Sequence, residues 1–383
     1  MPDEYPTQQS ILTAQAKPSS SDPKPTKINE PKVHFTETQS ILTQLETKLS
    51  TKVLCYYLPP GASINQSHPD IFLEQLRRIG TQDTISLIIV SNGGDSSASL
   101  RIATVIREYC KNLQIIIPSR CASAATVLAL SADKILMCPT GYLTAIDTSL
   151  NHGLNPKGPD NLPVSISVDQ IKRILRMLNE EGPAITDSSK EGAYRTLFKY
   201  IHPIPIGEID RISSRTILIA TKMMNMHSSS FSDQEKIKWI AEHLYNDYPE
   251  HGFPILYQEA KEIGLPVEKA DMSITTILRN LINYYDATTL PATTHFSENH
   301  YYLNCYTNLI ESVGLRTVFH ISYNKVLNSI THKWQKEDDT SRWVNITPSE
   351  KQGDLPIISH LDIAFYDEKG AVPENQLPAA DPT

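Results

Sequence analysis

Two short segments of this sequence combine residue types that can stabilise and attack a carbonyl group. The first is Ser-Asn-Gly-Gly-Asp at residues 91–95, and the second is Cys-Ala-Ser-Ala-Ala-Thr at residues 121–126. Adjacent glycines can adopt positive φ and bring bare N–H groups close to a ligand, as an oxyanion hole requires. A serine at a helix N-terminus exposes its Oγ at the positive end of the helix dipole. There, the N–H of Ala124 could serve as an oxyanion donor beside Ser123.

Each segment also has a simpler interpretation. Asn-Gly and Gly-Gly pairs are common turn formers, and serine is among the most frequent helix N-caps. Their shared position favours chemistry, because each segment follows a predicted strand and precedes a predicted helix. Such junctions on neighbouring parallel strands meet at one edge of a sheet. We therefore expect the two segments to lie together.

The elements that must position these segments follow from the hydrophobic pattern. Between about residues 51 and 137, short apolar runs alternate with amphipathic stretches, which is typical of β-α-β units on a mostly parallel sheet. Apolar stripes at helical spacing predict further helices after residue 151. The predicted strands cover 52–58, 85–90, 113–117, 134–137, 318–321 and 343–346, and the predicted helices cover 97–111, 123–131, 171–178, 237–248 and 274–285.

Composition excludes several classes of function. The 35 Lys and Arg against 43 Asp and Glu give a net charge of −8, and without a basic block this disfavours nucleic-acid binding. No apolar run is long enough to span a bilayer, and residues 1–40 contain no signal-peptide core, so we expect a cytoplasmic protein. The five cysteines lie far apart, mostly in apolar runs, which predicts reduced core thiols. Without C-x-x-C, H-E-x-x-H or G-x-G-x-x-G motifs, neither a metal nor a cofactor is expected.

The string from residue 86 to residue 150 resembles the Clp-protease/crotonase superfamily. Further strings resemble one branch, the serine dehydrogenase proteinase family, whose relatives include signal peptide peptidase A. The resemblance runs in order over roughly residues 50–350. It is carried by IREYC, LALSADKI and AID, then by PVSISVD, IHPIPIGEIDR and EAKEIGLPVE.

The resemblance implies an α/β fold with a Clp/crotonase-like parallel β-α-β spiral core. It implies a serine peptidase acting through an acyl-enzyme on Ser123, with the loop at Gly93 and Gly94 and the N–H groups of Gly94 and Ala124 forming the oxyanion hole. The sequence departs from the family where Asn92, Ala125 and Thr148 replace proline, glycine and proline. A non-catalytic assembly scaffold and an acyl-thioester hydrolase remain alternatives.

Three residues are candidates for the general base. Asp147 occupies about the position of the catalytic histidine of Clp-type peptidases, but a carboxylate needs burial to become an effective base. Lys199 could act as in the Ser-Lys dyad of signal-peptide-peptidase relatives, and His202 carries the commonest basic group. We rank Lys199 and His202 above Asp147, and Lys157 and Lys172 could also reach the site.

The domain organisation follows from composition and pattern. Proline, serine and threonine dominate the first 40 residues, which predicts a disordered arm over residues 1–45. A hydrolase domain is expected over 46–290, a small mixed β extension over 291–366 and a disordered tail over 367–383. The expected partners are a peptide or protein substrate and further copies of the chain.

Overall fold

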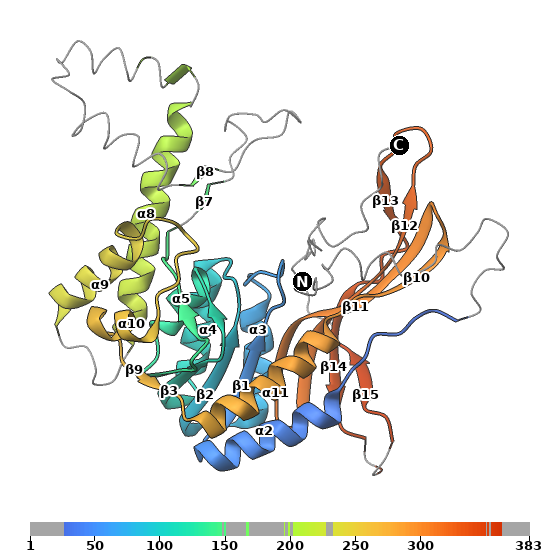
Figure 1. Cartoon of the computed structure of the whole chain (residues 1–383), viewed down its shortest axis with the longest axis horizontal. Coiled ribbons are helices and arrows are strands. Elements are labelled where there is room, and N and C mark those ends of the chain that lie inside the picture. The colour runs from blue at the N-terminus through green and yellow to red at the C-terminus, as the bar shows by residue number, and fades with distance from the viewer. Residues whose placement is uncertain are drawn as a thin grey trace, which may run out of the picture. The chain divides into compact units, whose positions relative to one another are not determined.

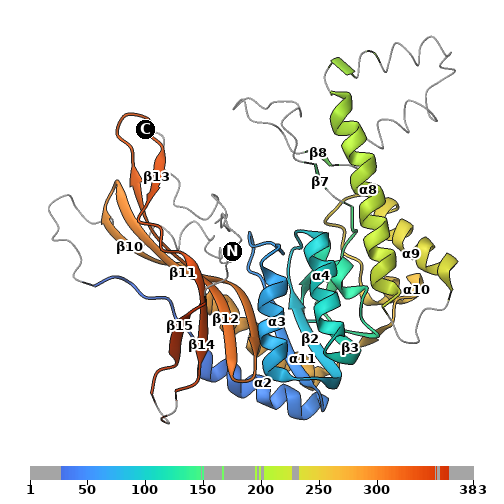
Figure 2. The same cartoon turned by 180° about the vertical axis from the view of Figure 1, so that it is seen from behind.

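The computed structural model describes residues 27–147, 149–150, 166–167, 195, 198–199, 202–226, 233–349, 351 and 354–361. The chain divides into two compact units (Figures 1 and 2). The central unit comprises residues 64–69 and 81–270, and the terminal unit comprises residues 1–63, 70–80 and 271–383. This division differs from the predicted one, because the terminal unit draws on both ends of the chain.

The central unit contains the predicted parallel α/β arrangement. Its strands lie in the order β2-β3-β5-β9, and every neighbouring pair is parallel. The last six residues of β2 are all buried, as expected for a strand covered on both faces. The strands are β2 (Gln82–Val90), β3 (Cys110–Ile117), β5 (Lys134–Met137) and β9 (Val267–Lys269), with a short parallel pair β4 (Arg120–Cys121) and β6 (Tyr142–Leu143).

Helices of the central unit follow the strands. In α4 (Ser96–Arg107), Ile102, Ala103 and Ile106 are buried on one face, and Asp95 caps its first turn. The short helix α5 (Ala124–Ala129) is buried along its whole length. The other elements that the structure describes in this unit are α8 (Pro203–Met224), α9 (Gln234–Asn246), α10 (Tyr257–Ile263) and the antiparallel pair β7 (Ser149–Leu150) and β8 (Ile166–Ser167).

The terminal unit is built around long antiparallel strands. Its strand order is β15-β14-β12-β11-β1, with β10 beside β11 and β13 beside β12. The predicted small mixed β region is therefore antiparallel in the described residues, and β11 and β12 are each 13 residues long. The strands are β1 (Lys52–Tyr57), β10 (Ala292–Ser297), β11 (His300–Ser312), β12 (Leu315–Leu327), β13 (Trp334–Glu337), β14 (Arg342–Thr347) and β15 (Ile357–His360).

Within the described residues, the terminal unit also contains three helices. They are α2 (Phe35–Leu49), the part of α3 (His68–Ile79) that begins at residue 70, and α11 (Met272–Thr288). The prediction of a disordered arm to residue 45 is wrong from Phe35 onward, because α2 buries Phe35, Leu42 and Leu45. Composition alone missed this helix because its apolar residues are few but lie on one face. Residues 1–26, the predicted helix at 171–178 and the predicted tail at 367–383 lie outside the described residues.

A buried ion pair ties α2 to the long strands. Nε of Arg316 lies 2.9 Å from Oε2 of Glu311, and both side chains are fully buried. Thr38 on α2 donates a hydrogen bond of 2.8 Å to Oε1 of Glu311, and Arg316 also donates to the carbonyl of Val33. The charges are thus paired and hydrogen-bonded, as burial requires. This network explains why the segment around residues 33–38 is ordered.

Candidate active site

Ser123 lies at the N-cap of α5 in a backbone conformation that serine seldom adopts, with φ 54° and ψ −119°. Its side chain makes no capping hydrogen bond to the helix. The simple N-cap interpretation of this serine therefore fails, although the residue does stand at the cap position. Non-glycine residues at positive φ cost free energy and cluster at active sites.

Gly93 contacts the backbone around Ser123 so closely that a side chain has no room. A Cβ atom on Gly93 would lie 2.7 Å from the Ala122 carbonyl oxygen, 2.7 Å from Ser123 Cβ and 2.9 Å from the Ala124 nitrogen. The φ of Gly93 is 103°, in the region that favours glycine. The two segments singled out from the sequence therefore lie side by side.

Gly94 is held with similar closeness against Ile64. A Cβ on Gly94 would lie 2.4 Å from both the nitrogen and the oxygen of Ile64. Ile64 donates to the Gly93 carbonyl at 2.8 Å, and its own carbonyl accepts the Asp95 N–H at 2.9 Å. Both hydrogen bonds of this parallel bridge involve the residues before and after Gly94, namely the Gly93 carbonyl and the Asp95 N–H. The N–H of Gly94 itself therefore points away from Ile64.

The backbone N–H groups of the site fall into two kinds. Gly93 donates to Ser91 Oγ at 3.0 Å, so its N–H is already engaged in shaping the loop. Within the described residues, the N–H groups of Gly94 and Ala124 have no assigned acceptor. The Ala124 N–H belongs to the first turn of a helix, where backbone donors lack intrahelical partners. Both can therefore serve a developing oxyanion.

A chain of hydroxyl groups holds the Ser123 backbone from the other side. The Ser123 N–H donates to Thr144 Oγ1 at 2.8 Å, and the Thr144 N–H donates to Thr126 Oγ1 at 3.1 Å. Thr126 Oγ1 in turn donates to the Cys121 carbonyl at 2.8 Å. Thr126 closes the segment at residues 121–126 that was singled out from the sequence, but nothing in the sequence indicated its role. Thr144 stands in no such segment, and its partners Ser123 and Thr126 lie about twenty residues earlier in the chain.

The neighbouring cysteine does not compete as a nucleophile. Cys121 is completely buried, and burial raises the pKa of its thiol far above the ordinary value. It is therefore a neutral thiol at physiological pH. The described part of the chain also contains no cluster of His, Cys, Asp and Glu side chains suited to a metal ion.

The three predicted bases occupy different environments. Lys199 is exposed, and His202 is an exposed N-cap of α8 whose Nδ1 accepts the Ile204 N–H at 3.2 Å. Asp147 is buried, with 5% of its surface accessible, and Oδ1 lies 2.8 Å from His251 Nδ1. Within the described residues, none of the three forms a hydrogen bond with Ser123 Oγ. Lys157 and Lys172 lie outside the described residues.

The Asp147–His251 pair was not anticipated from the sequence. His251 lies in the loop between α9 and α10, where no spacing or motif links it to Ser123 or Asp147. The hydrogen bond to Asp147 raises the pKa of His251 above its usual value, against the opposing effect of burial. Only the folded chain brings these two residues together.

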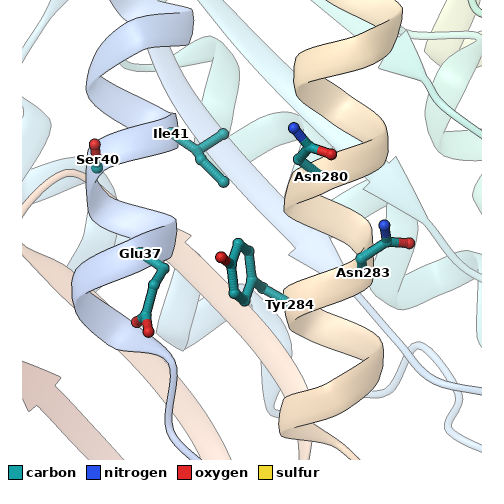
Figure 3. Close-up of a pocket in the computed structure, with 6 residues that line it drawn as sticks. All are labelled: Glu37, Ser40, Ile41, Asn280, Asn283 and Tyr284. Atoms are coloured by element: carbon teal, nitrogen blue, oxygen red, sulfur yellow. The ribbon is translucent and has the colours of Figure 1, made fainter.

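A separate hollow in the terminal unit contains none of the predicted catalytic residues. It is an open hollow of about 630 Å³ between α2 and α11, and Figure 3 shows polar side chains from both helices around it. Its lining residues are Glu37, Ser40, Ile41, Asn280, Asn283 and Tyr284.

Comparison with known proteins gives a family for the segment that carries this geometry. Residues 62–156 match the family of ClpP-like SDH-type serine proteinases. This match confirms the family resemblance for the part of the chain that contains the Gly-Gly loop and Ser123. It supports a peptidase of the Clp class.

Two curated relatives share less than a quarter of their aligned residues with this chain. The chain is 22% identical to the uncharacterized protein MJ0137 of Methanocaldococcus jannaschii over 63% of this chain and 78% of the relative. It is 23% identical to MJ1495 of the same organism over 48% of this chain and 51% of the relative.

Two solved structures align with 60% of this chain, and their backbones superpose poorly. A variant of the 1510-N membrane-bound stomatin-specific protease is 14% identical over 82% of its own length, with a TM-score of 0.33. ClpP1 from Listeria monocytogenes is 15% identical over 99% of its own length, with a TM-score of 0.32. In the part of this chain that the structure describes, no helix has the length and apolarity to cross a membrane.

Proposed function

We propose that this chain is a serine peptidase that cleaves peptide bonds through an acyl-enzyme on Ser123. The observation that carries the proposal is the conformation of Ser123, whose positive φ turns the side chain away from capping α5. The nearby N–H groups of Gly94 and Ala124 supply the two donors that an oxyanion needs. The family match over residues 62–156 supports the same class of chemistry.

The reaction follows from these positions. Ser123 Oγ attacks the substrate carbonyl carbon while a base takes the hydroxyl proton, and the carbonyl oxygen becomes an oxyanion. The Gly94 and Ala124 N–H groups stabilise this charge, and the protonated base then gives its proton to the departing amine. Water then attacks the resulting ester on Ser123 while the same base accepts its proton. The base returns that proton to Ser123 Oγ as the bond to the acyl carbon breaks and the acid leaves.

The identity of the base stays a proposal. Lys199, His202 and Asp147 are the candidates from sequence, and of these the burial of Asp147 best fits a group that works within a protected site. A lysine acts as a base only when desolvation keeps its amine neutral. Lys199 is exposed, so its surroundings do not supply that desolvation. The exposed His202 already uses Nδ1 at the cap of α8.

The central test is covalent labelling with a fluorophosphonate probe. Wild type should label, and Ser123→Ala should not, because phosphonylation requires the attacking hydroxyl. Ser97→Ala is the matched control, because Ser97 lies just after the other strand-to-helix junction. Its hydrogen bond to Asp95 is made by the backbone N–H, which alanine keeps. Labelling that survives Ser123→Ala would overturn the proposal.

A non-catalytic scaffold is the second candidate. It is favoured by one observation, the absence in the described residues of a hydrogen bond between Ser123 Oγ and a base. Folded wild-type protein that labels no faster than Ser123→Ala would support it.

We also propose that the chain forms homo-oligomers, because Ile204, Leu218 and Trp239 of the central unit expose 57%, 54% and 51% of their surface.

A further inference from the structure

The strongest unassigned feature near Ser123 is the pair formed by Asp147 and His251. Two segments distant in sequence run antiparallel here, since Leu143 and Ile255 exchange backbone hydrogen bonds of 3.0 and 2.8 Å. Asp147 comes four residues after Leu143, and His251 comes four residues before Ile255. The backbone therefore sets the two side chains opposite each other.

The same segment holds the backbone of Ser123. Thr144, next to the bridge at Leu143, accepts the Ser123 N–H at 2.8 Å. Asp147 follows Thr144 by three positions, which span at most about 10 Å of extended chain. One short segment thus carries both the support of the serine and the carboxylate partner of His251.

In this pair the carboxylate is buried, whereas the imidazole is partly exposed. The Asp147 side chain is 7% exposed, whereas the His251 side chain is 39% exposed. Nδ1 of His251 faces the carboxylate, and within the described residues no partner is assigned to Nε2. A buried carboxylate on Nδ1 with Nε2 available is the arrangement that prepares an imidazole to accept a proton from serine.

A second histidine–aspartate pair provides a comparison. His243 Nδ1 lies 2.7 Å from Asp247 Oδ2, but that carboxylate is 58% exposed. The two residues are one turn apart on and beyond α9, so their contact is a local surface interaction. Of these two pairs, only Asp147–His251 joins distant segments and buries its carboxylate.

We propose that His251 is the proton acceptor for Ser123 and that Asp147 is the residue that positions it. This proposal rests on the proposed serine peptidase function. In the step itself, the Ser123 Oγ–H proton passes to His251 Nε2 as the bond from Oγ to the carbonyl carbon forms. The Asp147 carboxylate stabilises the imidazolium through its hydrogen bond to Nδ1, and the imidazolium then gives the proton to the leaving amine.

The geometry has a pH consequence. The charged group facing His251 in the described residues is Asp147, and their hydrogen bond raises the pKa of His251 above the usual value for histidine. Below that pKa the imidazole is protonated and cannot accept the serine proton. Labelling should therefore slow as pH falls through a midpoint above the usual pKa of histidine, and Asp147→Asn should move that midpoint downward.

The experiment measures fluorophosphonate labelling rates against pH for the full chain. His251→Ala should reduce the rate by about 10² to 10⁴ at a temperature where the protein remains folded, and added imidazole should restore part of it. Asp147→Asn should slow labelling and shift the midpoint. His243→Ala is the matched control and should label like wild type.

The outcomes separate the two proposals. Wild type that does not label at Ser123 overturns the peptidase function and this assignment with it. Wild type that labels, together with a His251→Ala protein of the same rate and pH profile, overturns only the assignment of His251. Slower labelling by folded His251→Ala without imidazole rescue and without a changed pH midpoint also overturns it, because a merely structural role predicts that result.

Discussion

Replacing Gly93 with alanine tests the contact on which the candidate site depends. The added methyl group would lie 2.7 Å from the Ala122 oxygen and from Ser123 Cβ, well inside the 3.4 Å at which ordinary contact begins. Both atoms belong to the turn formed by Ala122 and Ser123. No change of rotamer can move them, because their positions are fixed by the backbone. Either the Gly-Gly loop or the turn at Ser123 must shift.

The size of the effect follows from these contacts. Alanine at the φ of 103° found for Gly93 costs about 1 to 2 kcal/mol of backbone strain. Overpacking adds about 1 to 3 kcal/mol. A displacement of about 1 Å between nucleophile and oxyanion donors lowers the rate about 10²-fold. We therefore expect a large loss of labelling beside a moderate loss of stability.

Gly80→Ala separates steric conflict from backbone strain. Gly80 has φ 73°, so alanine is strained there too, but its added Cβ would have no neighbour within 4 Å. Gly80→Ala should lower the melting temperature slightly and label at the wild-type rate. Labelling is measured with a fluorophosphonate probe at a temperature where all proteins remain folded.

The result that would refute this reasoning is Gly93→Ala protein that labels like wild type. It would mean that the Gly93 loop can move without disturbing Ser123. Equal losses of labelling in both variants would also refute it, since strain alone would then explain the effect.

Three further predictions follow from other contacts. Thr144→Val removes the acceptor of the Ser123 N–H, so labelling should slow at least tenfold, and Thr144→Ser should restore it, because an unmade buried hydrogen bond costs about 1 to 3 kcal/mol. Arg316→Met leaves Glu311 buried and unpaired, which should lower the free energy of unfolding by about 3 to 5 kcal/mol in urea titrations, whereas adding Glu311→Leu should recover part of it. Light scattering at micromolar concentration should give a mass above that of the 42.9 kDa chain, and a monomer mass would contradict oligomerisation.

The central strands and the candidate nucleophile could be predicted from local sequence. The strand predicted at residues 134–137 has the observed bounds of β5, and those at 85–90 and 113–117 fall within β2 and β3. Runs of apolar residues identify buried strands because the signal lies in adjacent positions. For the same reason, the Gly-Gly loop and Ser123 could be recognised as strand-to-helix junctions that would meet.

Tertiary structure decided the surroundings of the nucleophile and the composition of the terminal unit. Thr144 supports Ser123, and His251 pairs with Asp147, although no motif announces either contact. The helix α2 is ordered because Thr38 meets Glu311, a residue of the distant strand β11. Short-range hydrophobic periodicity determines which segments become strands and helices. The partner of a buried polar group depends instead on how distant segments pack, because any of many donors and acceptors could satisfy it.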